Sequence, residues 1–428
     1  MPKVHQAKLA PIWKRAYRTF REEGWAGVRY KSWRRLGAEA LRGWLYWHSR
    51  GLPGRVAAHR EVPITPDQVR TVAFLKLWGL GDTVMATPAL KMLRRHFTAA
   101  RIILVAPSAV CGVLRGTPVL DEVVELPQDD FLFRLGPSPA LYRAFRRVQL
   151  LAPELLLVSY PMNFWRIREI LERLGARWVI APELDLKPGR GTVRVPIPDD
   201  RHTVLVNADL SAAAGCAGDV PPMDLWLTEA ERAEAAAWLG KTHPPKPWVC
   251  FHVGSTPGLP QKKWPADYFI ELGNRLQRKR GGAIFILEGP DETEEVRRVA
   301  AGLERPPRIV GRELSLRGAM ALIERMDAVV SGSSVWMHVA VATKAPVVCI
   351  SGPTPPSYGP WGDPAIHREV RSPVSCSPCW DWSTPIACQD PECMRQITVP
   401  MVETVVEELL LQAQTCQKSP AGLPAEKD

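Results

Sequence analysis

The chain has 428 residues, of which 46% are hydrophobic and 23% are charged. This composition is ordinary for a globular protein of two to three domains, and it excludes global disorder. A run of about 18 uncharged apolar residues, which a membrane-spanning helix needs, does not occur in the sequence. No apolar segment with a small-residue cleavage site lies near the start, so we expect the chain to fold in the cytoplasm.

The net charge of +10 is concentrated at one end of the chain. Residues 1–60 hold 14 Lys and Arg against three Asp and Glu, which leaves a net charge of −1 for residues 61–428. A nearly neutral body lacks the clustered cations that neutralise phosphates, so we expect no nucleic-acid partner.

The basic arm, residues 1–60, contains an amphipathic helical pattern. One side of the expected helix carries Trp33, Leu36, Ala40, Trp44 and Trp47. Three interpretations stay open. The arm binds an anionic membrane surface through residues 1–50, as helices rich in Trp and Arg do, or it forms a helical hairpin packed on the body. Nucleic-acid binding by the arm is a third, weaker interpretation.

From residue 70 onward, short apolar runs alternate with helical patterns, which is typical of parallel sheets covered on both faces. The expected strands are Val72–Leu77, Ile102–Ala106, Leu155–Ser159, Val204–Asn207, Val249–Val253, Ile284–Leu287, Ala328–Ser331 and Val347–Ile350. A proline-rich break at 242–247 divides them into two groups. We therefore predict an α/β fold with two Rossmann-like, doubly wound domains at 70–241 and 248–412, facing a cleft. A flexible tail is expected at 415–428.

The first candidate site residue is Asp82, in the turn Gly79-Leu-Gly-Asp82 that follows the first expected strand. Ligands of such sheets bind at the carboxyl ends of the strands. A carboxylate here either caps the next helix or acts as a general base beside backbone that glycine leaves accessible, and the local sequence leaves both open. A nicotinamide fingerprint needs a third glycine where the chain has Val84, so that cofactor is not expected.

Turns after later strands carry groups that suit a diphosphate, namely hydroxyls, an ammonium and the free N–H groups of helix starts. Taken by itself, each of these turns fits a solvated surface loop equally well, and that alternative stays open. The candidates that these turns supply are Ser255, Thr256, Lys262, Asp291, Ser333, Ser334, His338 and Thr354.

Five motifs in register resemble glycosyltransferase family 9, the ADP-heptose:lipopolysaccharide heptosyltransferases. They are Gly-Leu-Gly-Asp at 79–82, Lys-Lys-Trp-Pro at 262–265, Gly-Pro-Asp-Glu at 289–292, Met-His-Val-Ala at 337–340 and Gly-Pro-Thr at 352–354. Their order and spacing agree with the family over about residues 70–410. The resemblance implies a GT-B fold. It also implies an inverting, metal-independent transfer of heptose from an ADP-sugar to a lipid-linked, lipopolysaccharide-core-like acceptor at the inner face of the cytoplasmic membrane, with no cofactor.

The resemblance also implies roles for single residues. Asp82 matches the proposed base. Contacts to the donor nucleotide are implied for Ser255, Thr256, Lys262 and Thr354 on the diphosphate side, for Asp291 near the ribose, and for Ser334 and His338 near the diphosphate and donor sugar.

The chain departs from the family where Ser333 replaces an acidic residue and Val335 replaces glycine. A serine hydroxyl holds sugar hydroxyls without the assistance of a charge. Two alternatives therefore stay open. One is a relative that uses another nucleotide sugar, and the other is a nucleotide-binding module without catalysis.

Four of the nine cysteines lie close together in the sequence, at Cys376, Cys379, Cys388 and Cys393. A Cys-x-x-Cys pair followed by two further cysteines fits a structural zinc site. Free thiols or an occasional disulfide fit the same spacing, so the state of this cluster stays open.

Overall fold

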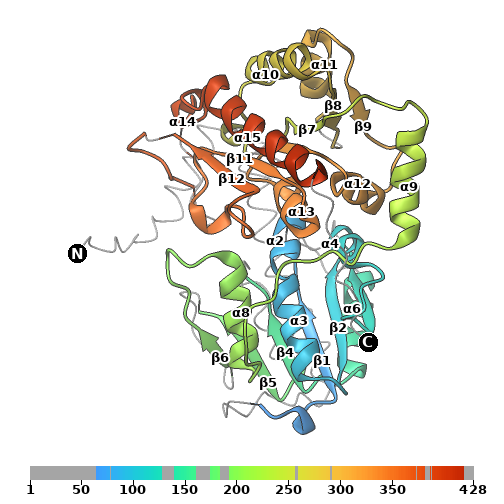
Figure 1. Cartoon of the computed structure of the whole chain (residues 1–428). Coiled ribbons are helices and arrows are strands. Elements are labelled where there is room, and N and C mark those ends of the chain that lie inside the picture. Colours follow the sequence, from blue (N-terminus) through green and yellow to red (C-terminus); the bar gives the residue numbers. More distant parts are fainter. Residues whose placement is uncertain are drawn as a thin grey trace, which may run out of the picture.

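Two six-stranded sheets, parallel throughout, form the two halves of the molecule (Figure 1). This computed structural model describes residues 64–77, 79–127, 139–160, 174–183, 192–255, 259–289, 292–372, 374–380, 386 and 388–418. The basic arm and most of the predicted tail therefore lie outside the described residues. None of the described helices has the length and apolar character that a membrane crossing requires.

The two sheets have the same topology. The first runs in the order β3-β2-β1-β4-β5-β6, and the second in the order β12-β11-β10-β7-β8-β9. Counted from its own first strand, each sheet has the order 3-2-1-4-5-6 of a doubly wound fold. The strands are β1 (Thr71–Leu75), β2 (Arg101–Pro107), β3 (Glu122–Leu126), β4 (Leu155–Val158), β5 (Trp178–Pro182), β6 (Thr192–Val195), β7 (Trp248–His252), β8 (Ala283–Leu287), β9 (Arg308–Val310), β10 (Ala328–Gly332), β11 (Val347–Ser351) and β12 (His367–Arg371).

Helices cover both faces of each sheet, because the central strands are apolar on both sides and must be shielded from water. They are α2 (Leu80–Met85), α3 (Thr87–His96), α4 (Ser108–Leu114), α6 (Pro139–Leu150), α8 (Thr203–Ala213), α9 (Glu229–Gly240), α10 (Ala266–Arg280), α11 (Thr293–Gly302), α12 (Leu316–Ile323), α13 (Val335–Thr343), α14 (Glu392–Arg395) and α15 (Val399–Lys418). Short 3-10 turns lie at η1 (Pro66–Gln68), η3 (Pro260–Lys262) and η4 (Pro356–Tyr358).

The predicted α/β fold is confirmed, and seven of the eight expected strands are present as β1, β2, β4, β7, β8, β10 and β11. The expected strand Val204–Asn207 is wrong, because these residues lie in α8. The ring nitrogen of His202 accepts a hydrogen bond from the backbone N–H of Val204 and caps this helix. A short apolar run in a largely buried helix has the same residue pattern as a buried strand.

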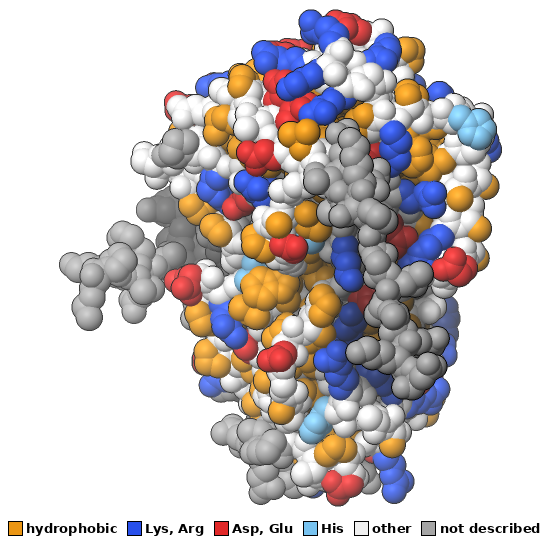
Figure 2. Space-filling view, in the orientation of Figure 1, with side chains coloured by type: hydrophobic (Ala, Val, Ile, Leu, Met, Phe, Trp, Pro, Cys, Tyr) orange, Lys and Arg blue, Asp and Glu red, His pale blue; other side chains and the backbone are white. Residues whose placement is uncertain are grey.

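The two halves pack directly on each other. Helix α2 lies against α13, and α4 lies against α12, so one cluster of buried apolar side chains continues from the first sheet to the second. On the face shown in Figure 2, hydrophobic side chains gather at the waist between the halves. Close approach is built into this contact, since a Cβ added at Gly81 would lie 2.8 Å from Cδ2 of His338.

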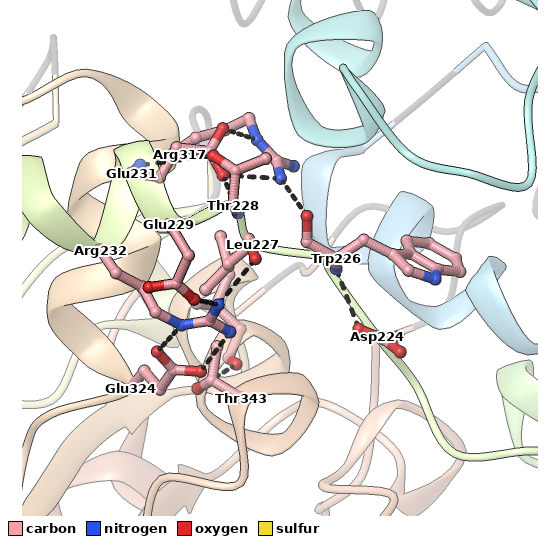
Figure 3. Close-up of polar contacts among 11 residues, drawn as sticks. Asp224, Trp226, Leu227, Thr228, Glu229, Glu231, Arg232, Arg317, Glu324 and Thr343 are labelled. Carbon is pink, nitrogen blue, oxygen red and sulfur yellow. Dashed lines mark hydrogen bonds and ion pairs between the residues drawn. The ribbon is translucent and has the colours of Figure 1, made fainter.

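Arg317 of α12 bonds to the connecting segment, residues 214–247 between α8 and β7, and to both halves (Figure 3). This guanidinium is only 5% exposed, and it donates to the backbone oxygens of Val113, Leu225 and Trp226 at 2.6, 3.0 and 3.0 Å. It also forms an ion pair with Glu231, which belongs to the capping box that begins α9. The bonds join α4 of the first half, the connecting segment and α12 of the second half.

Candidate functional site

A cleft of about 1230 Å³ lies between the halves, at the carboxyl ends of β1, β7, β8 and β10. The second half places there β7 and β10, the strand pair at which its order reverses, and the first half places there β1, one strand of its corresponding pair; doubly wound sheets bind ligands at such points. Of the predicted site residues, those that line the cleft are Asp82, Ser255, Lys262, Ser333, Ser334 and His338.

Asp82 is the carboxylate that the first half presents to the cleft. It is the third residue of α2, whose N-cap is Gly79, so it is not the cap residue. Gly79 has φ of +64°, and a Cβ there would lie 1.9 Å from Oδ2 of Asp82. Only glycine suits both the backbone conformation and the folded-back carboxylate. Burial raises the pKa of Asp82, while two lysines and its own backbone amide oppose that shift.

The two lysines, Lys76 and Lys262, approach Asp82 from opposite halves of the molecule. Lys76 follows β1, is fully buried, and donates from Nζ to the backbone oxygen of Tyr160 at 3.2 Å. Lys262 lines the cleft and is 6% exposed. Burial lowers the pKa of each lysine to about 8, and the charge of Asp82 opposes that shift in both. The site therefore places one carboxylate between two ammonium groups.

The sequence predicted Lys262 but not Lys76. The available signal was a lysine at the end of the apolar run Val72–Leu77, because a charge there needs a partner when the strand is buried. Lys262 is further held by Trp380, whose ring centroid lies 4.5 Å from Nζ.

The turn before α13 brings together Ser333, Ser334 and His338. Ser333 donates from Oγ to the backbone oxygen of Tyr358 at 3.2 Å. His338 is 4% exposed, and burial, followed by the charges of His202 and Lys262, lowers its pKa to about 3, so the ring is neutral. Its Nδ1 is buried and has no hydrogen-bond partner among the described residues.

A chain of hydrogen bonds that the sequence did not predict crosses the second half. His252, the last residue of β7, lies 3.1 Å from Glu292 through Nε2 and 3.0 Å from Ser334 Oγ through Nδ1. Although burial raises it, the pKa of Glu292 stays below its ordinary value because of the hydrogen bond and charge of His252. The available signal was a histidine at the end of one strand, β7, and a glutamate in the turn after the following strand, β8. Sequence spacing alone does not pair these two residues.

The remaining predicted residues are distributed as follows. Ser255 donates from Oγ to the backbone oxygen of Leu259 at 3.0 Å. Thr354 is buried, is not among the residues that line the cleft, and accepts a hydrogen bond from Arg371 at its backbone oxygen. Thr256 and Asp291 lie outside the described residues.

Among the residues that the structure describes, the four cysteines of the cluster do not form a metal-binding group. Cys376, Cys379 and Cys388 are exposed thiols, and Cys393 is buried. Within the described residues there is no group of three or more His, Cys, Asp and Glu side chains that could hold a metal ion. The structural zinc interpretation therefore gains no support from this geometry.

The fold and the cleft define a two-domain α/β protein with the GT-B architecture. The model of glycosyltransferase family 9 (heptosyltransferase) matches residues 169–388. The chain is 25% identical over 301 residues to lipooligosaccharide heptosyltransferase 2 of Haemophilus influenzae, covering 66% of this chain and 83% of that protein.

Two solved structures share the fold. The glycosyltransferase family 9 protein from Veillonella parvula has a TM-score of 0.68 at 20% identity, covering 82% of this chain and all of that one. Escherichia coli heptosyltransferase WaaC with ADP has a TM-score of 0.60 at 17% identity, and the match covers 79% of this chain and 99% of WaaC. The chain belongs to glycosyltransferase family 9, and it is a glycosyltransferase.

Proposed function

We propose that this enzyme transfers a heptose from an ADP-sugar to a lipopolysaccharide-core-like acceptor, with inversion at the anomeric carbon. The observation that carries the proposal is the buried carboxylate of Asp82, which lines the cleft together with Lys262 and interacts with the charge of that ammonium. An ADP donor is supported by the relative that was solved with ADP.

The proposed reaction is a single displacement. An acceptor hydroxyl attacks the anomeric carbon from the face opposite the nucleotide, its proton passes to Asp82, and ADP leaves. General-base catalysis of this kind contributes about 10²- to 10⁴-fold to a rate. A raised pKa makes Asp82 a stronger base once it is ionised.

Charge develops on the leaving diphosphate, and the second half offers groups to stabilise it. Lys262 supplies an ammonium, and the start of α13 supplies free backbone N–H groups. We propose that these groups suffice without a metal ion. Full turnover in the presence of EDTA is the expected result.

The acceptor and its location are also proposals. A lipid-linked saccharide would be reached at the inner face of the cytoplasmic membrane, with residues 1–50 on anionic lipid. Flotation with anionic liposomes, comparing the full chain with a chain that lacks residues 1–60, tests this role. Equal flotation of the two chains would remove it.

A second donor class is favoured by one observation. The Ser333 hydroxyl is neutral and is already bonded to Tyr358, so it holds a sugar hydroxyl more weakly than a carboxylate would. A relative that uses another nucleotide sugar is therefore the alternative, and a non-catalytic nucleotide-binding module is the third reading.

Calorimetry with a panel of ADP-sugars and UDP-sugars, followed by turnover assays on those that bind, separates these functions. The proposal expects ADP-heptose to bind more tightly than any UDP-sugar and to be turned over. Equal binding of ADP- and UDP-sugars would contradict the heptose assignment. Binding without turnover on any acceptor tested would favour the non-catalytic module.

A further inference from the structure

The hydrogen-bond chain through His252 joins two walls of the donor side of the cleft. Glu292 lies directly before α11, and Ser334 is the N-cap of α13, and both line the cleft. His252 lies between them, is 4% exposed, and has both ring nitrogens engaged.

The backbone around Glu292 is shaped to bring its carboxylate to His252. A Cβ added at Gly254 would lie 1.7 Å from Oε1 of Glu292, and one at Gly289 would lie 2.7 Å from Oε2. The backbone N–H of Gly289 also donates to Oε2 at 2.9 Å. The Glu292 Oε1 therefore contacts His252, and Oε2 accepts from Gly289. Positions 254 and 289 require glycine, because a Cβ there would collide with this carboxylate.

The direction of each hydrogen bond determines what Ser334 presents to a ligand. An ionised Glu292 only accepts, so Nε2 of His252 carries a proton. If Nδ1 is unprotonated, it accepts the Ser334 hydroxyl proton. If Nδ1 is protonated, it donates to Ser334 Oγ, and the Ser334 O–H can donate either to Ser331 Oγ or to a ligand in the cleft. Ser331 Oγ, 3.0 Å from Ser334 Oγ, already donates to the backbone oxygen of Gly332.

We propose that His252 is a positioning residue, held as an imidazolium by Glu292 in the nucleotide complex, so that the Ser334 hydroxyl donates to the diphosphate. This inference rests on the proposed function, because it requires a nucleotide in the cleft. The other charged side chains of the second half that line the cleft are Lys262, Lys263, Glu288, Arg312 and Glu313, and Lys263 pairs with Glu295. The lysines disfavour a charged His252, whereas Glu292 and a bound diphosphate favour it.

A double-mutant cycle tests the relay, with ADP as the probe in calorimetry. Glu292→Gln is expected to weaken ADP binding about 10-fold, the effect of losing one charge-assisted hydrogen bond. In a Ser334→Ala background the same substitution is expected to change affinity less than twofold. Glu294→Gln, an exposed glutamate in the first turn of α11, is the matched control and should leave affinity unchanged. An equal loss from Glu292→Gln in both backgrounds would overturn the relay.

A spectroscopic readout separates positioning from a merely structural role. In ¹⁵N-histidine spectra at about pH 7.5, the His252 signal, assigned by its loss in His252→Gln, should report two protonated nitrogens in the ADP complex. It should report a neutral ring in the complex of Glu292→Gln. A neutral His252 in the wild-type complex would refute the inference. If the wild-type chain binds no ADP, the proposed function fails, and an unchanged His252 signal in both free Glu292→Gln and free Ser334→Ala would then refute the relay itself.

Discussion

Replacing Arg317 with methionine should destabilise the whole molecule, because one buried guanidinium satisfies four groups. Its removal leaves the backbone oxygens of Val113, Leu225 and Trp226 and the carboxylate of Glu231 without their donor. Breaking a buried ion pair costs about 3–5 kcal/mol. The Glu231 side chain is 18% exposed, so water recovers part of its hydration, and we expect about 3 kcal/mol.

A matched control lies in the same network (Figure 3). Arg232 pairs with Glu324, but these side chains are 36% and 30% exposed. Exposed ion pairs contribute about 1 kcal/mol or less, so Arg232→Met should cost that amount. Urea unfolding followed by tryptophan fluorescence and by circular dichroism measures both free energies. Equal midpoints for the two variants would refute the reasoning that burial of Arg317 gives its bonds their value.

Two further predictions concern the surroundings of Asp82. Lys76→Met removes a charge that lowers the pKa of Asp82, so the acid limb of the pH–rate profile should move to higher pH by about 1–3 pH units; an unmoved limb would show that Lys76 does not act on the base. Gly79→Ala should reduce turnover more than about 10-fold, because the new Cβ displaces the Asp82 carboxylate. In contrast, Gly116→Ala has a similar φ of +73° with nothing within 4 Å, and it should cost about 1 kcal/mol of stability while turnover stays normal. Similar turnover in the two alanine variants would contradict this account.

The parts of the fold that the sequence predicted are those with strong apolar runs. The seven confirmed strands are central or nearly so, and their continuous burial leaves a clear pattern. Strands at the sheet edges were missed because they are short or carry polar residues, as in Thr192–Val195 and His367–Arg371. The interior strand β5 was also missed, although all five of its residues are buried. The error at Val204–Asn207 has the opposite cause, since a helix that is mostly buried shows little of a polar face.

The candidate site divides in the same way. Asp82 and Lys262 stand in turns after strands, where topology alone brings side chains to one edge. Lys76, His252 and Glu292 were not predicted, because their roles depend on contacts between residues far apart in the chain. His252 and Glu292 are 40 positions apart in the chain, and no spacing rule would pair them.

The central claim is that Asp82 accepts the proton from the attacking hydroxyl. The most direct test is the turnover of Asp82→Asn at saturating donor and acceptor, measured together with ADP affinity. The account predicts a loss of about 10²- to 10⁴-fold in turnover. ADP should bind at least as tightly, because a negative charge near the diphosphate has been removed. Turnover within a few-fold of the wild type, with ADP still bound, would contradict the claim.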